Sequence, residues 1–222
     1  MGRGTRGIIL GLVVCASGLA IGWPWISERS MATPDHIAEA RSGDQAPQAG
    51  PEGLAFTDHT GRAVSERDFS GRYMLVFFGY THCPDVCPGN LSIMSAAMRR
   101  LGRAAEAVQP VFITFDPARD TPEILAEYVR HFHPRLTGLT GTPAQIEAAT
   151  RSYGVVFERA DAGGGGEAAD YSLRHTSQTY LIGPNGRGVA IFEHDSNPEE
   201  MASEILALLE QAPLRLTNGQ SS

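Results

Sequence analysis

The sequence predicts an α/β sandwich built on a central mixed sheet, and two observations lead to this prediction. Continuous apolar runs at 73–78 and 111–115 are typical of strands that are buried on both faces. Capping residues followed directly by proline, at Thr121, Thr142 and Asn197, predict helix starts after those strands. The last two also have a Gln or Glu where a capping box needs one.

The remaining elements follow in chain order from near Leu54. A turn at 58–62 joins two short strands, and Leu91, Met94, Met98 and Leu101 recur at helical spacing before Gly102, which predicts a helix that stops there. Short apolar runs predict three further strands, at Val155–Phe157, Thr179–Ile182 and Val189–Phe192. A turn at Pro184–Gly186 joins the last two strands as a hairpin.

This order of elements predicts a sandwich of the thioredoxin type. The stretch Arg159–Asp170 contains four consecutive glycines and predicts a mobile loop.

Composition and charge limit the possible partners. The 222 residues include 42% hydrophobic and 19% charged residues, as in a globular protein that buries a core. The net charge is −7, and no basic stripe occurs along the chain, so nucleic acid is not expected as a partner. Every basic residue is arginine, which points to a GC-rich bacterial genome.

The N-terminus predicts a membrane anchor. Residues 7–27 carry no charge, and a helix of that length spans roughly 30 Å, the thickness of a hydrocarbon core. Arg3 and Arg6 precede this run, and Trp23 and Trp25 lie near its end, which places the rest of the chain outside the cytoplasm. A cleaved signal peptide is the alternative, although the run is long for one.

The predicted organisation has four parts. Residues 1–27 form the cytoplasmic start and the transmembrane anchor, and residues 28–52 form a flexible tether rich in Ala, Pro and Gly. Residues 53–213 form the folded domain, and residues 214–222 form a tail.

One pair of cysteines carries the chemistry of the folded part. Cys83 and Cys87 lie where a buried strand turns into a helix, and backbone N–H groups at a helix start favour thiolates. Their spacing places the Cα atoms ~6 Å apart, which allows either a redox-active disulfide or a shared soft metal ion. Two buried, inert cysteines are the alternative. Cys15 lies inside the predicted anchor.

His175 is the expected third member of the site. It precedes the strand at Thr179–Ile182, and in thioredoxin-like folds the loop before this strand faces the cysteine turn. That loop usually contains a proline, and here it has a histidine instead. Two thiolates and one imidazole suit Cu(I) and also tolerate Cu(II), so we expect Cys83, Cys87 and His175 to bind copper. His82 is an alternative fourth donor, although a solvent-facing neighbour is the simpler interpretation.

Several motifs resemble the Sco (SenC) family of copper chaperones across the whole folded part. These are Gly79–Pro88, Asp116–Thr121, Gly138–Gly141, His175-Thr176 and Tyr180–Gly186. The resemblance implies an anchored protein that delivers copper to the dinuclear site of cytochrome c oxidase, with Cys83, Cys87 and His175 as ligands.

The implied location and partners follow from that resemblance. The chain would be held in a bacterial inner membrane with its domain in the periplasm. It would meet the copper-accepting subunit of a respiratory oxidase, a thiol reductant and a copper donor.

A thiol–disulfide oxidoreductase that reduces the cysteines of the oxidase subunit is the alternative function, and a redox or copper sensor is a third. A thiol peroxidase fits the spacing least.

Neighbouring residues are expected to influence the site without being ligands. Asp116 and Asp120 end a strand and begin a helix near it, and Asp85 lies between the cysteines. Arg174 departs from the family, which commonly has an acidic residue immediately before the ligand histidine. We expect that cation to alter Cu(II) affinity or docking without abolishing Cu(I) binding.

Overall fold

The computed structural model describes residues 55–161 and 171–217. These residues belong to the second of the two units, 1–41 and 42–222, into which the chain divides. The predicted anchor, Cys15 and the tether lie outside the described residues, as does the glycine run at 163–166. Within the described ranges, no helix combines the length and the apolar character needed to cross a membrane.

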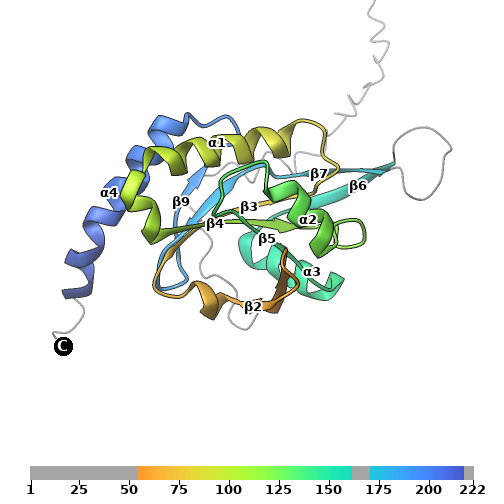
Figure 1. Cartoon of the computed structure of the whole chain (residues 1–222), viewed down its shortest axis with the longest axis horizontal. Coiled ribbons are helices and arrows are strands. Elements are labelled where there is room, and N and C mark those ends of the chain that lie inside the picture. The colour runs from red at the N-terminus through yellow and green to blue at the C-terminus, as the bar shows by residue number, and fades with distance from the viewer. Residues whose placement is uncertain (1–54, 162–170, 218–222) are drawn as a thin grey trace, which may run out of the picture. The chain divides into compact units, whose positions relative to one another are not determined.

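A seven-stranded mixed sheet forms the centre of the domain, in the order β2-β1-β5-β4-β3-β8-β9 (Figure 1). Its strands are β1 (Ala55–Asp58), β2 (Ala63–Ser65), β3 (Tyr73–Gly79), β4 (Val108–Thr114), β5 (Thr137–Thr140), β8 (Thr179–Ile182) and β9 (Gly188–Phe192). The strands β3, β4 and β5 run parallel to one another. Strand β1 pairs antiparallel with β5, and β8 pairs antiparallel with β3. The predicted central mixed sheet is thus confirmed, and β4 is buried along its whole length.

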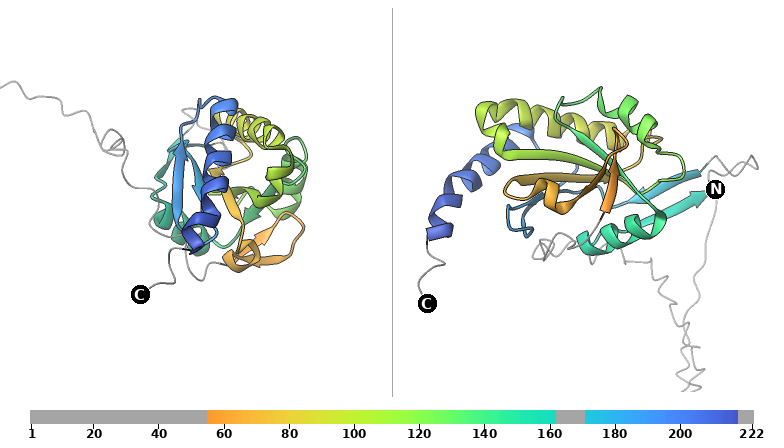
Figure 2. Two further views of the ribbon diagram at one scale, coloured as in Figure 1. Left: turned by 90° about the vertical axis from the view of Figure 1, so that its left-hand side faces the viewer. Right: turned by 60° about the horizontal axis from the view of Figure 1, so that its bottom comes forward.

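Helices cover both faces of this sheet. They are α1 (Val86–Arg100), α2 (Pro122–Val129), α3 (Pro143–Tyr153) and α4 (Pro198–Thr217), with the short 3-10 helices η3 (Glu66–Phe69) and η4 (Gly102–Ala107). Helices α1 and α2 lie on one face, α3 lies on the opposite face, and α4 packs beside α1 (Figures 1 and 2). Phe77, Phe78 and Phe112 are among the largest fully buried side chains, and they fill the space around the two central strands.

The predicted helix boundaries have clear physical causes. The Thr142 hydroxyl accepts from the backbone N–H of Gln145, whose side chain accepts from the N–H of Thr142, so the capping box is complete. Asn197 accepts from the N–H of Glu199 at 2.8 Å. Gly102 follows the end of α1 and has a φ of 55°, a left-handed conformation that glycine adopts without strain. Helix α4 reaches Thr217, beyond residue 213 where the sequence placed the end of the domain.

Two features of the chain differ from the prediction. Strand β5 was not predicted, and it lies between β1 and β4 in the sheet. The stretch predicted as a loop from Arg159 contains the end of a strand, β6 (Phe157–Asp161), which pairs antiparallel with β7 (Tyr171–His175). His175 is therefore the last residue of a strand. These two strands form a separate sheet that projects past the end of the central one (Figure 1).

Candidate metal centre

The cysteine turn, residues 79–87, lies at the carboxyl end of β3, where the chain leaves the sheet and enters α1. The N–H of Cys83 donates to the carbonyl oxygen of Tyr80 at 3.3 Å, which tightens the turn. Cys83 precedes the helix and Cys87 lies in its first turn, so the two thiols approach from consecutive turns of backbone. Loops at the carboxyl ends of parallel strands are common ligand sites, because each strand delivers its next residues to the same edge.

Gly79 is required for the close approach of Cys87 to the sheet. A Cβ atom at this position would lie 2.8 Å from Cys87 Sγ and 2.8 Å from a ring carbon of Phe112. Any larger side chain would therefore displace the sulfur or the packed ring. The absence of a side chain at the end of β3 is what allows the thiol to lie on the core.

The two cysteines have different environments. Both are free thiols, but Cys87 is fully buried and Cys83 is half-buried. The Cys87 thiol is the main donor that lowers the pKa of Cys83 to about 4, and the N–H of Cys87 also donates to Cys83 Sγ at 3.4 Å. The hydrogen bond between the two cysteine side chains, together with burial, raises the pKa of Cys87 well above its ordinary range. The turn thus holds one thiolate and one thiol.

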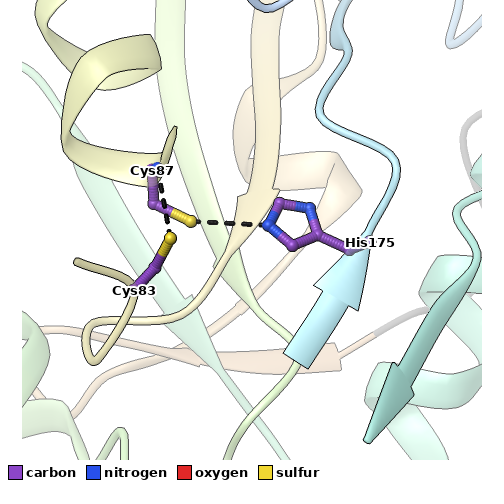
Figure 3. Close-up of side chains that lie close together, drawn as sticks. All are labelled: Cys83, Cys87 and His175. Carbon is purple, nitrogen blue, oxygen red and sulfur yellow. Dashed lines mark hydrogen bonds between the residues drawn. The ribbon is translucent and has the colours of Figure 1, made fainter. Parts of the chain in front are cut away.

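His175 turns one ring nitrogen toward the sulfurs (Figure 3). Its Nδ1 lies 2.8 Å from the carbonyl oxygen of Thr176, an acceptor that requires Nδ1 to carry a proton. Its Nε2 lies 3.6 Å from Cys87 Sγ, across 88 residues of sequence. In the neutral ring the lone pair of Nε2 therefore points at the cysteine turn, as a metal ligand must.

Aromatic rings surround the imidazole. The ring centroids of Phe115, Phe77 and Tyr80 lie 4.8, 6.3 and 6.4 Å from that of His175. Phe115 in turn stacks on Phe157 of β6 at 5.1 Å and 10°. These contacts limit rotation of the histidine ring.

The geometry of the three donor atoms fits a single soft metal ion. The two sulfurs and a ring nitrogen all lie within 4.8 Å of one another. Bonds of about 2.3 Å to sulfur and about 2.0 Å to nitrogen would place the donors of a planar three-coordinate ion ~3.7–4.0 Å apart. The arrangement therefore needs a contraction of less than ~1 Å to bind one, and thiolate with imidazole suits copper or zinc.

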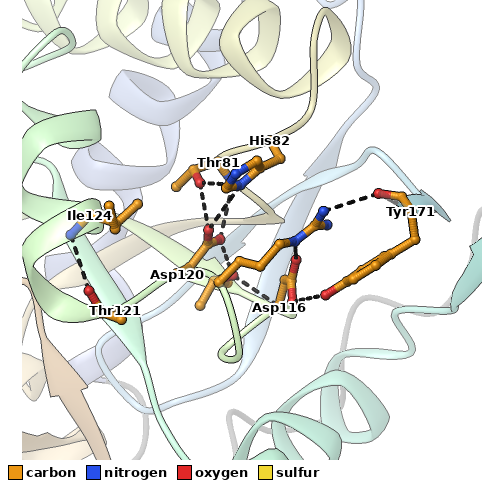
Figure 4. A network of polar contacts seen from close by, with 9 residues as sticks. Thr81, His82, Asp116, Asp120, Thr121, Ile124 and Tyr171 are labelled. Atoms are coloured by element: carbon orange, nitrogen blue, oxygen red, sulfur yellow. Dashed lines mark hydrogen bonds and ion pairs between the residues drawn. The ribbon is translucent and has the colours of Figure 1, made fainter. Parts of the chain in front are cut away.

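Asp120 fixes the beginning of the cysteine turn through hydrogen bonds to Thr81 (Figure 4). Its carboxylate is fully buried and accepts from the N–H of Thr81 at 3.0 Å, from the Thr81 hydroxyl and from the Thr114 hydroxyl. Burial raises the pKa of Asp120. The Nδ1 atom of His82 lies 3.1 Å from the Thr81 hydroxyl, and its side chain is half exposed, so this ring faces Asp120 and solvent.

The other predicted neighbours have different surroundings, and of these only the backbone N–H of Asp85 is among the groups that lower the pKa of Cys83. Asp85 is exposed at the N-cap of α1, although its side chain makes no capping hydrogen bond. Asp116 is buried and contacts Arg119 and Tyr171, two residues to which the sequence assigned no role. Arg174 is exposed and lies directly opposite Glu158 in the β6–β7 register, so its cross-strand neighbour carries the opposite charge.

Comparison with known proteins extends the match over most of the chain. The SCO1/SenC family model matches residues 44–210. The human mitochondrial SCO2 homolog is 36% identical over 208 residues, which cover 92% of this chain and 75% of that protein.

Two solved structures with copper bound share the fold. Bradyrhizobium japonicum ScoI is 39% identical with a TM-score of 0.65, covering 72% of this chain and 98% of that one. Yeast Sco1 is 30% identical with a TM-score of 0.68, covering 79% and 96%. The chain therefore belongs to the SCO1/SenC family and has its thioredoxin-like fold.

Proposed function

We propose that this protein is a copper chaperone that binds one copper ion through Cys83, Cys87 and His175. The observation that carries the proposal is the convergence of two sulfurs and one imidazole nitrogen within 4.8 Å, from segments far apart in the sequence. The copper bound to relatives of 39% and 30% identity favours copper over zinc as the ion.

The environment of each donor suits capture of the ion. Cys83 is already a thiolate near neutral pH, because its pKa is lowered to about 4, and it would bind first. Cys87 would lose its proton on binding, which the charge of the ion favours. A ring with its proton on Nδ1, as the contact with the Thr176 carbonyl oxygen favours, would bind the ion through the lone pair of Nε2.

Delivery is proposed to end at the dinuclear copper site of cytochrome c oxidase, in line with the family resemblance. The ion would pass to the acceptor by stepwise ligand exchange, each acceptor ligand replacing one donor of this site. The proposed setting is the periplasmic side of a bacterial inner membrane, with residues 1–27 as the anchor. A copper donor and a thiol reductant would complete the cycle.

The decisive experiment offers copper and zinc together to the reduced protein and measures the metal retained after gel filtration. We expect one copper per chain in the wild type and a severe loss in His175→Ala. The control is His82→Ala, which removes the adjacent histidine that faces away from the sulfurs. Equal copper in wild type and His175→Ala would refute the proposed ligand set.

A thiol–disulfide oxidoreductase is the second candidate, and the asymmetry of the cysteines favours it. The Cys83 thiolate would attack a disulfide of the target, releasing one target thiolate and forming a mixed disulfide. Cys87 would then lose its proton and attack Cys83, which releases the second target thiolate and leaves a Cys83–Cys87 disulfide. An external thiol reductant must then restore the pair. Insulin reduction at a rate comparable to thioredoxin, unchanged in His175→Ala, would support this function.

A further inference from the structure

The strand that carries His175 is not held by the central sheet. Within the described residues, β6 and β7 pair only with each other. After His175 the chain leads on to β8 at Thr179, and Asn90 of α1 donates to the carbonyl oxygen of Ser177 at 2.9 Å. Before His175, the position of β7 depends on side-chain contacts, and one group of these lies at its first residue, four positions before the histidine.

Three residues, Asp116, Arg119 and Tyr171, join β7 to the loop between β4 and α2, and we call them the Tyr171 clamp. Figure 4 labels Asp116 and Tyr171. The Tyr171 hydroxyl donates to the carboxylate of Asp116, and the Nε of Arg119 donates to the same carboxylate. Another guanidinium nitrogen of Arg119 donates to the backbone carbonyl oxygen of Tyr171 at 3.2 Å. The guanidinium carbon lies 3.6 Å from the centroid of the Tyr171 ring, in a cation–π contact.

The clamp is shielded from solvent, which strengthens its charge-assisted hydrogen bonds. The Asp116 and Arg119 side chains are only 4% and 16% exposed. By contrast, both partners of the ion pair between Arg151 and Glu147 on α3 are more than 60% exposed, and such surface pairs contribute little.

A second set of contacts leads from the clamp to the imidazole. The Tyr80 hydroxyl accepts from the N–H of Leu173 at 3.2 Å, two residues along β7. The Tyr80 ring lies beside both the Arg119 guanidinium and the His175 ring. A shift of β7 at Tyr171 would therefore lengthen the hydrogen bond between Leu173 and Tyr80 and displace the ring of His175.

We propose that Asp116, Arg119 and Tyr171 are positioning residues that hold β7 at a fixed position relative to the cysteine turn. They thereby set the rate at which the site loses copper. The clamp touches neither sulfur nor imidazole, and it acts through the placement of His175. The part of this inference that concerns copper rests on the proposed function, whereas the part that concerns the position of β7 does not.

Tyr171→Phe tests the clamp with the smallest possible change, because it keeps the ring on Arg119 and removes only the hydroxyl donated to Asp116. In the copper-free protein we expect the Leu173 amide to exchange with solvent several-fold faster. In the copper-loaded protein we expect loss of copper to a chelator about 10-fold faster, as is typical when a group that orients a metal ligand is removed. The matched control is Tyr153→Phe, which removes a phenol hydroxyl on the opposite face of the sheet and should change neither rate.

A double-mutant cycle separates positioning from general destabilisation. In a His175→Ala background, Tyr171→Phe should change the rate at which the small remaining copper fraction is lost by less than about twofold, because the clamp acts only through the missing ligand. An equal acceleration in both backgrounds would overturn the inference, as would an unchanged Leu173 amide in Tyr171→Phe. If the wild type itself retains no copper, the proposed function fails, and the amide exchange of Leu173 still decides whether the clamp holds β7.

Discussion

The two halves of the candidate metal centre are held in different ways. The cysteine turn grows out of the buried strand β3, with Cys87 on the core, Gly79 leaving room for its sulfur and Asp120 fixing Thr81. His175 lies at the end of β7, which belongs to a separate two-stranded sheet and is joined to the body by side chains. One half is part of the core, and the other is docked on it.

This difference suits the proposed transfer of copper. Cys87 lies on the core and cannot move without disturbing it, so the cysteine turn would keep the ion while an acceptor approaches. The histidine can withdraw when its hairpin shifts, because no central strand pairing is lost. We therefore expect His175 to be the first ligand released during transfer.

The largest expected contrast lies in the reactivity of the cysteine turn. Alkylation of Cys83 should vary less than about twofold between pH 8 and 5, because its pKa is lowered to about 4 and the thiolate persists until the pH falls through that value. An ordinary thiol with a pKa of about 8.5 would lose several hundredfold in thiolate over the same range. Mass spectrometry of the alkylated Cys83 peptide measures the rate. In Cys87→Ala, which lacks the main hydrogen-bond donor, the rate should fall steeply below pH 8; a flat profile there would exclude Cys87 as the cause.

Native-state hydrogen exchange compares the two halves directly. Backbone amides that donate hydrogen bonds between β3 and β4 should exchange at least about a hundredfold more slowly than those that donate between β6 and β7. The reason is that a docked hairpin can open without global unfolding. Equal protection in the two sheets would show that the hairpin opens only together with the core, and the comparison would fail.

Gly79→Ala tests how closely the cysteine turn depends on the core. The added Cβ would lie 2.8 Å from both Cys87 Sγ and the Phe112 ring, and overpacking of this kind costs about 1–3 kcal/mol in the free energy of unfolding. Chemical denaturation measures that loss. The control is Gly89→Ala in α1, where a Cβ meets nothing within 4 Å and should be neutral or slightly stabilising. Equal free energies of unfolding for the two variants would mean that the cysteine turn does not pack tightly on the core.

The smallest expected effect concerns Arg174. Arg174→Glu would place a second carboxylate directly opposite Glu158. Like charges opposite each other across a strand pair cost about 0.2–1 kcal/mol in stability. Faster amide exchange confined to β6 and β7 would report this change. The double variant Glu158→Arg/Arg174→Glu should restore slow exchange; if it does not, the cross-strand pair makes no contribution.

Much of the fold could be predicted because its signals are local. The buried runs of β3 and β4, the capping residues before α2 and α3, and Gly102 after α1 each act within a few residues. Strand β5 has only four residues, Thr137–Thr140, two of them threonine and one glycine, and it becomes a strand because β1 and β4 lie on either side.

The hairpin that carries His175 had a signal that the glycine run obscured. In β7 the half-buried Tyr171, Leu173 and His175 alternate with the exposed Ser172 and Arg174, the period of a strand with one covered face. The convergence of Cys83, Cys87 and His175 could be predicted, because the cysteine spacing and the position of the histidine restrict the choice. The Tyr171 clamp could not, since 52 residues separate Arg119 from Tyr171 and no sequence period joins them.

X-ray absorption spectroscopy of the copper-loaded protein tests the central claim most directly, because it counts the atoms bound to the ion. For the wild type, the structure predicts two sulfur neighbours and one imidazole nitrogen around a single copper. For His175→Ala, it predicts that the little copper still retained gives no imidazole signal and is bound by the two sulfurs. An unchanged imidazole signal in His175→Ala, or a wild-type copper bound only by sulfur, would contradict the proposed site.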